Sequence, residues 1–141
     1  MVSPFFQEEF PSSLDAMGEA LMRALASLQD GDWIEPDQAF YARLCLEEAL
    51  LNAIMHGNRW DATRRVRLEM FGEGDICRIR VKDEGPGFSP DAVALPESDQ
   101  EGGRGICLIR YCMEEVHFDP VERCLEMKMR RKGLCRGGVR P

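Results

Sequence analysis

Two stretches of the chain repeat apolar residues at helical spacing. The first follows Ser12 and Ser13, either of which can cap a helix, and its apolar positions recur every three or four residues. These positions are Leu14, Met17, Leu21, Leu25 and Leu28. The polar run at 29–32 ends that helix. The second runs from Pro36, which suits a first helical turn, to His56. It is apolar around most of its circumference, which is typical of a buried helix.

Three other stretches alternate apolar and polar residues, which predicts strands. Their apolar positions are Val66, Leu68 and Met70, then Cys77, Ile79 and Val81, and finally Leu125, Met127 and Met129. Shorter strands are expected at Phe5–Phe6 and 116–118, a hairpin turn at 72–75 and a helix at about 104–111. Each readable strand is apolar on one face only. The pattern therefore predicts an α+β two-layer sandwich, with a mixed, mostly antiparallel sheet and helices on one face.

Composition narrows the class of protein. The 141 residues are 44% hydrophobic and 30% charged, as expected for one globular domain covering residues 1–141. The net charge of -7 argues against a general nucleic-acid binder. The first residues lack the basic start and apolar run of a signal peptide, and no stretch is apolar enough to cross a membrane. We therefore expect a cytoplasmic protein with no membrane contact.

The six cysteines do not form CxxC pairs, so a zinc site is not expected. Cys45, Cys77 and Cys107 lie in apolar runs and are predicted to be core residues with reduced thiols. The folded core is expected to cover about 12–131. The tail from Arg130 to Pro141 is basic and rich in glycine, and we expect it to fray.

Polar residues interrupt the buried second helix at regular intervals. Glu48, Asn52 and His56 are four residues apart, so they form one polar stripe. Two explanations stay open at this point: the stripe is a satisfied or solvent-facing ladder, or it serves a ligand. Gly57 is expected to end the helix in the usual glycine C-terminal cap.

A second unusual residue follows the strand that ends near Lys82. The two-residue period places Asp83 on the apolar face, where an aspartate either contacts a ligand or caps the next turn. Residues 84 to about 105 are then rich in glycine and proline. Long loops of this kind inside compact domains are usually functional or disordered.

Three motifs follow one another along the chain. They are the helix with Glu48 to Gly57, the segment Asp83 to Phe88, and Gly102 to Gly105 at a helix start. Together they resemble the GHKL ATP-binding (Bergerat) fold, shared by DNA gyrase, a heat-shock chaperone, histidine kinases and a mismatch-repair protein. Within it the chain is most similar to the small bacterial anti-sigma-factor serine kinases. Those carry E-x-x-x-N-A-x-x-H-G, D-x-G-x-G-F and a short lid ending in G-x-G. The resemblance covers roughly residues 36–130.

The resemblance implies a nucleotide site for ATP and Mg²⁺. Asn52 would coordinate the Mg²⁺, since an amide oxygen suits a hard cation. Asp83 would accept a hydrogen bond from the adenine amino group. Gly85 and Gly87 would let the backbone pass close to the nucleotide.

It also implies a phosphate loop and a general base. Gly103 and Gly105 would face the phosphates at a helix N-terminus, and Arg104 would either add charge there or face solvent. Glu48 would be the base that deprotonates a protein serine, or else a water. Its neighbour Glu47 points about 100° away on the helix and is the weaker candidate. His56 is expected to be structural.

One segment departs from the family pattern. These kinases carry a Gly-Thr pair in the last strand, whose threonine supports the adenine-binding aspartate. The matching segment here, 123–126, reads Arg-Cys-Leu-Glu. Adenine contact would then be weaker, or the support would come from elsewhere.

Three functions follow from the resemblance. The leading one is an anti-sigma factor that is also an ATP-dependent serine/threonine kinase, with a sigma factor and a STAS-domain antagonist as partners and a possible homodimer. The second is a nucleotide-responsive binding module without significant turnover. The third is the catalytic domain of a histidine-kinase-type system. The only histidines are His56 and His117, and no phospho-acceptor helix is expected before the site, which counts against the third function.

Overall fold

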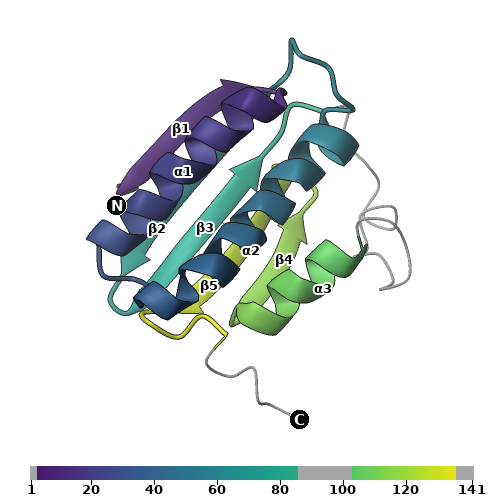
Figure 1. Ribbon diagram of the computed structural model, residues 1–141. Coiled ribbons are helices and arrows are strands. Elements are labelled where there is room, and N and C mark those ends of the chain that lie inside the picture. Colours follow the sequence, from purple (N-terminus) through teal and green to yellow (C-terminus); the bar gives the residue numbers. More distant parts are fainter. Residues whose placement is uncertain (1–2, 86–102, 136–141) are drawn as a thin grey trace.

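The computed structural model describes residues 3–85 and 103–135, which form a five-stranded sheet with three α-helices on one face (Figure 1). In chain order the elements are β1 Phe6–Pro11, α1 Leu14–Asp30, a 3-10 turn Pro36–Gln38, α2 Ala39–Asn52, a π-helical turn Ala53–Gly57, β2 Arg65–Glu73, β3 Ile76–Lys82, α3 Gly103–Cys112, β4 Glu115–Asp119 and β5 Cys124–Arg130. The predicted α+β class is confirmed.

The strand order is β1-β2-β3-β5-β4, and every pairing among the described strands is antiparallel. The mixed sheet that the sequence allowed is therefore not what forms. Its apolar face meets the three helices, and its other face carries the charged positions of the alternating strands. There Arg80 and Arg78 lie 3.2 and 3.3 Å from the Glu126 carboxylate. This open, charged face is the reason why each strand is apolar on one side only.

Helix α1 forms as predicted from its cap and its apolar spacing. The Ser13 side chain accepts a hydrogen bond from the Ala16 amide at 3.1 Å, which satisfies one of the free N–H groups of the first turn. The residues that it buries are Met17, Ala20, Leu21, Ala24, Leu25 and Leu28. They fix α1 on the sheet beside β1 and β2 (Figure 1).

The second predicted helix differs from an ideal α-helix at both ends. Pro36 opens it in a 3-10 turn, and the last residues, Ala53–Gly57, widen into a π turn in which the Asn58 amide reaches back to the Ala53 carbonyl at 2.7 Å. The expected glycine cap is wrong, because Gly57 does not adopt the left-handed conformation. Among the described glycines only Gly74, in the hairpin turn between β2 and β3, has a positive φ.

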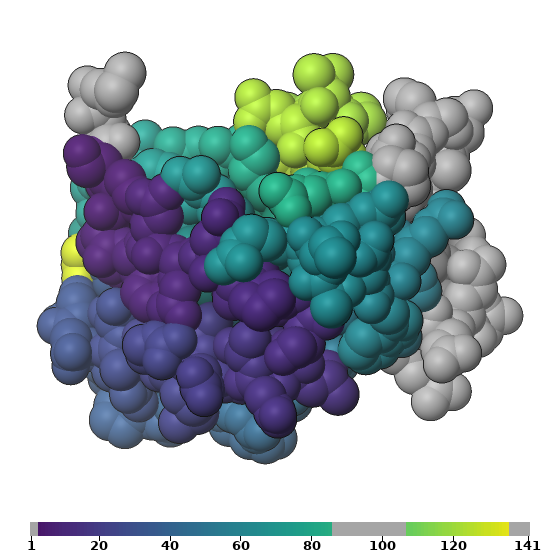
Figure 2. All heavy atoms as spheres, turned by 90° about the horizontal axis from the view of Figure 1, so that it is seen from above, coloured from purple at the N-terminus to yellow at the C-terminus, as the bar shows by residue number. Residues whose placement is uncertain are grey.

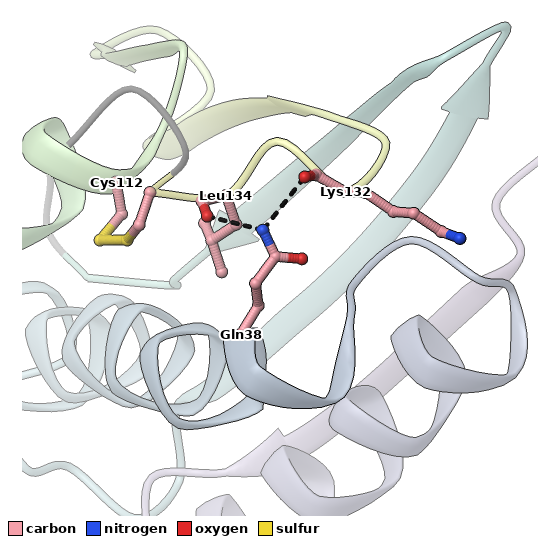
Figure 3. The surroundings of a disulfide bond; sticks show 5 residues. Gln38, Cys112, Lys132 and Leu134 are labelled. Carbon is pink, nitrogen blue, oxygen red and sulfur yellow. Dashed lines mark hydrogen bonds between the residues drawn. A yellow bond between two sulfur atoms is a disulfide. The ribbon is translucent and has the colours of Figure 1, made fainter. Parts of the chain in front are cut away.

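The chain after β5 is more ordered than its composition predicts (Figure 3). Leu134 is 1% exposed in the core, and Cys135 forms a disulfide with Cys112 at the end of α3. The Gln38 amide donates to the carbonyl oxygens of Lys132 at 3.1 Å and Leu134 at 2.8 Å. Fraying from Arg130 onward is therefore wrong for residues 130–135, and the core extends past residue 131. Residues 136–141 lie outside the described part.

The disulfide joins two cysteines for which no pairing was predicted, whereas Cys45, Cys77 and Cys107, predicted to be reduced thiols, are free. Cys45 and Cys77 are buried, as expected, whereas Cys107 is exposed and not a core residue. Sequence spacing could not reveal the pair, because Cys112 and Cys135 are 23 residues apart and meet only through the packing of α3 and the tail. Within residues 3–85 and 103–135, no helix is long and apolar enough to cross a membrane.

Candidate functional site

The predicted site residues on α2 and after β3 lie toward one end of the sheet, where both of these elements end (Figure 1). In Figure 2 the blue-teal end of α2, the teal end of β3 and the yellow-green turn between β4 and β5 lie side by side. A backbone hydrogen bond of 3.4 Å joins the Asp83 amide after β3 to the Arg123 carbonyl in that turn. Segments distant in the sequence therefore meet around Asp83.

Asp83 lies against two glycines. It is 9% exposed, and its Oδ1 accepts a hydrogen bond from the Gly85 amide at 2.8 Å. A Cβ on Gly57 would overlap the Asp83 carboxylate, and a Cβ on Gly85 would overlap the Gly57 carbonyl oxygen. Gly57 is thus needed for close approach and not as a cap, and it leaves the buried carboxylate in contact with the end of the helix.

One oxygen of this carboxylate has no donor among residues 3–85 and 103–135. Among the described residues, hydrogen bonds reach Asp83 only at Oδ1, so Oδ2 can accept from a ligand. Burial raises the pKa of the Asp83 carboxyl above its ordinary value, and the Gly85 amide, Arg123 and Arg64 oppose that shift. Of the two explanations for Asp83, the cap is confirmed through Gly85, and its second oxygen has no donor in the described part of the chain.

Asn58 is a buried polar residue that the sequence analysis missed. Its side chain donates to the Ser12 hydroxyl at 2.8 Å and to the Arg65 carbonyl at 3.0 Å, and it accepts from the Glu84 amide at 2.8 Å. It thereby fixes the end of the π turn to the ends of β1, β2 and β3. The sequence did contain a signal for this role, because Asn58 is a polar residue directly after the end of a buried helix.

Glu48 and Asn52 lie one turn apart on α2, and both are half-buried. Burial, and then the neighbouring Glu47, raise the pKa of the Glu48 carboxyl. The Asn52 Nδ2 atom is buried and has no hydrogen-bond partner in the described structure. An unpartnered buried amide is costly unless a ligand completes it. His56 falls in the π turn and is exposed, so the stripe splits into a half-buried pair and a surface histidine.

The Asn52 amide fits the predicted magnesium site in its chemistry. Its carbonyl oxygen is the ligand type that Mg²⁺ accepts alongside waters and phosphate oxygens. The atom without a partner in the described structure is Nδ2, a donor, which would pair with an acceptor such as a phosphate oxygen and not with the ion itself. Asn52 is the residue of this chain that would hold the ion.

Of the predicted phosphate loop, the structure describes the backbone from Gly103 onward. Helix α3 begins at Gly103, so Gly103, Arg104 and Gly105 form its first turn, where free N–H groups and the helix dipole favour an anion. Gly87 and the rest of residues 86–102 lie outside the described residues. The glycine motif starts a helix, as the sequence predicted.

Arg123 and Cys124 lie in the segment where the resemblance to the anti-sigma kinases led us to expect a Gly-Thr pair. Arg123 has a φ of 52°, a left-handed conformation that glycine adopts without strain. Cys124 begins β5, and burial raises the pKa of its thiol to about 11. The backbone that a glycine would serve is therefore kept, while the hydroxyl that a threonine would offer is missing.

Comparison with known proteins agrees with this architecture. The chain matches the family described as "Histidine kinase-like ATPase domain" over residues 10–129. This match covers most of the chain, which therefore belongs to that family. No curated protein matches significantly.

Two solved structures resemble the fold. The histidine kinase domain of the Erythrobacter litoralis EL346 blue-light activated histidine kinase aligns over 82% of this chain, with a TM-score of 0.57 and 20% identity. A longer structure of that kinase aligns over 82%, with a TM-score of 0.58 and 19% identity. The chain spans 61% of the first structure and 42% of the second, less than two thirds of either. At these identities the likeness concerns the fold alone.

Proposed function

We propose that this ATPase-family protein is an anti-sigma factor with serine/threonine kinase activity. It would transfer the γ-phosphoryl group of ATP to a serine or threonine of a STAS-domain antagonist and so keep a sigma factor bound. The observation that carries this proposal is the pairing of a half-buried acid, Glu48, with the incomplete Asn52 amide one turn later on α2.

The nucleotide would bind across the end of the sheet. The Asp83 carboxylate, with Oδ2 without a donor among the described residues, would accept the adenine amino group beside Gly57 and Gly85. The first turn of α3 would place its N–H groups toward the phosphates. Asn52 would hold Mg²⁺, which neutralises charge on the phosphates.

Glu48 would then act as the general base. A carboxyl whose pKa burial raises takes up a proton more readily than an exposed one, which suits a base operating near neutral pH. As the serine oxygen forms its bond to the γ-phosphorus, its proton passes to Glu48 and the bond to ADP breaks. Water excluded from a half-buried site cannot compete as easily for the phosphoryl group.

Two alternatives have support of their own. The family match and the structural neighbours fit the catalytic domain of a histidine-kinase-type system, in which the acceptor histidine belongs to another segment or protein. The replacement of the Gly-Thr pair by Arg123–Cys124 favours a nucleotide-responsive switch without significant turnover. We further propose a cytoplasmic location and a homodimer, with no direct contact to nucleic acid or membrane.

Phosphoryl transfer to a purified partner distinguishes these functions. The protein is incubated with Mg²⁺ and γ-labelled ATP, together with each STAS-domain protein encoded in the same genome. We expect label on one STAS protein, stable to acid as a phosphoserine or phosphothreonine is. Acid-labile label would indicate histidine chemistry, and ATP binding without any label would indicate the switch.

Two variants of adjacent acids make the assay specific. If Glu48 is the base, Glu48→Gln should slow transfer by about 10²- to 10⁴-fold, the usual contribution of general-base catalysis, while keeping ATP affinity. Glu47→Gln is the matched control, since Glu47 is also half-buried on α2 but faces another direction, and it should retain the rate. Transfer by Glu48→Gln at the wild-type rate would end the assignment.

A further inference from the structure

Three hydrogen bonds form a closed ring beside Asp83. The Asn58 Nδ2 atom donates to the Arg65 carbonyl oxygen at 3.0 Å, and the Arg65 amide donates to the Glu84 carboxylate at 2.6 Å. The Glu84 amide then donates to the Asn58 Oδ1 atom at 2.8 Å, which closes the ring. The ring therefore ties the end of the π turn and the start of β2 to the residue that directly follows Asp83.

This ring lies next to the contact between the helix end and the Asp83 carboxylate. Asn58 follows Gly57 in the chain and Glu84 follows Asp83, so the bond between Asn58 and Glu84 sets the spacing of these two segments. They are in direct contact, because a Cβ on Gly57 would overlap the carboxylate. The Gly85 amide, at 2.8 Å from Oδ1, fixes the rotation of that carboxylate. A shift of the Glu84 backbone would therefore move the carboxylate as well.

Hydrogen bonding accounts for the choice of asparagine at position 58. The residue is 0% exposed, and its Nδ2 atom also donates to the Ser12 hydroxyl at 2.8 Å. That hydroxyl in turn donates to the Arg64 carbonyl oxygen at 2.7 Å. An apolar side chain could fill the same space, but it would leave the Glu84 amide and the Arg65 carbonyl without these partners, which is costly for buried groups.

We propose that Asn58 is a positioning residue for the nucleotide base, which holds the Asp83 carboxylate where it accepts the adenine amino group. This inference rests on the proposed function. Asn58 is buried, so it acts through the Glu84 amide and not by touching the nucleotide. The geometry of a hydrogen bond is narrow, so a small displacement of the carboxylate weakens its bond to adenine.

A residue at the disulfide end provides a matched control (Figure 3). Gln38 is 4% exposed, and its side-chain amide also makes three hydrogen bonds. It donates to the Lys132 and Leu134 carbonyl oxygens and accepts from the Glu35 amide. Truncating either amide side chain therefore removes the same number of buried hydrogen bonds, but only Asn58 is bonded to the residue after Asp83.

The first test compares Asn58→Ala with Gln38→Ala in the full chain. Both changes should lower the urea midpoint of unfolding. Calorimetry with ATP and Mg²⁺, under conditions in which both variants are folded, should show a difference. We expect Asn58→Ala to weaken ATP binding about 10- to 100-fold, the effect of losing one hydrogen bond to a charged acceptor. Gln38→Ala should bind ATP as the wild type does.

The second test alters the ring at its exposed member, where the fold is not at risk. Glu84→Ala removes the acceptor of the Arg65 amide, whereas Glu84→Gln keeps an acceptor oxygen at that place. Glu84→Ala should weaken ATP binding about two- to tenfold, as expected for one hydrogen bond to a neutral group. Glu84→Gln should bind ATP nearly as tightly as the wild type. This pair of variants decides the inference if Asn58→Ala does not fold.

The outcomes separate this inference from the proposed function. Wild-type ATP affinity in both Asn58→Ala and Glu84→Ala would overturn the inference alone. A wild type that binds no ATP would overturn the proposed function, and hydrogen exchange of the Gly85 amide in the nucleotide-free protein would then test whether Asn58 holds the Asp83 turn. That exchange should be faster in Asn58→Ala and unchanged in Gln38→Ala. Equal exchange rates in Asn58→Ala and the wild type would overturn the positioning role.

Discussion

The two ends of the sheet are built on opposite principles. At the end that holds the disulfide, the buried Gln38 side chain finds its partners within the protein: it donates to two carbonyls and accepts from the Glu35 amide at 2.7 Å. At the Asp83 end, Asn52 Nδ2 and Arg123 Nε stay unpartnered among the described residues. Gln38 is thus satisfied within the protein, whereas the two donors near Asp83 have no partner among the described residues and can meet a ligand.

Small residues also serve the two ends differently. At the disulfide end Gly31 and Gly72 make room for Trp33, whose ring atoms would lie 2.8 and 2.7 Å from added Cβ atoms, and the Arg131 guanidinium covers that ring at 3.9 Å. At the site end Gly57 and Gly85 make room for a carboxylate. The missing side chains of these glycines make room for an aromatic ring at one end of the sheet and for a carboxylate at the other.

The largest effect should come from the buried tail. Leu134→Ala should lower the free energy of unfolding by about 2–5 kcal/mol, the range for removing a buried leucine side chain. Urea denaturation measures it. ATP affinity per folded molecule should stay unchanged, because Leu134 lies at the end of the sheet opposite Asp83. A selective loss of ATP binding would contradict the separation of the two ends.

The disulfide should contribute somewhat less than the Leu134 side chain to the free energy of unfolding. Cys135→Ala should lower the free energy of unfolding by about 3 kcal/mol, as expected for a crosslink closing a loop of this size. Thermal unfolding of this variant, with and without a reducing agent, checks the assignment. Reductant should lower the melting temperature of the wild type toward that of the variant and leave the variant itself unaffected.

Gly57→Ala should act on the site as well as on stability. Its Cβ would overlap the Asp83 carboxylate, so the free energy of unfolding should fall by about 1–3 kcal/mol, as for overpacking, and ATP binding should be lost. The control is Gly18→Ala in α1, where an added Cβ meets nothing within 4 Å. That change should stabilise the helix by about 0.5–1 kcal/mol and leave ATP binding intact.

The smallest effect is expected on the pH dependence of the stability of the nucleotide-free protein. Because burial raises the folded-state pKa of Asp83, the folded protein holds this proton more tightly than the unfolded chain does. Its stability should therefore fall as pH rises from the ordinary carboxyl pKa through the raised one. Asp83→Asn should remove that part of the pH dependence. Chemical denaturation of both proteins at several pH values measures the difference, and identical slopes would show that burial leaves Asp83 unperturbed.

The sequence predicted what depends on periodicity and local chemistry. Alternation located β2, β3 and β5, and it placed Asp83 on the buried face, where the structure has it. What it missed depends on tertiary contacts. The role of Gly57 depends on a carboxylate 26 residues later, the order of the tail depends on Gln38 and Cys112, and Asn58 joins three strands. None of these contacts produces a repeating pattern of residue types in the sequence.

We propose that the end of the sheet around Asp83 binds ATP through this carboxylate. Isothermal calorimetry of wild type and Asp83→Asn with ATP and Mg²⁺ tests it most directly, with circular dichroism to show that both are folded. We predict saturable ATP binding by the wild type and its loss in Asp83→Asn, which removes the carboxylate but keeps its shape. Equal ATP affinity of the two folded proteins would contradict the claim.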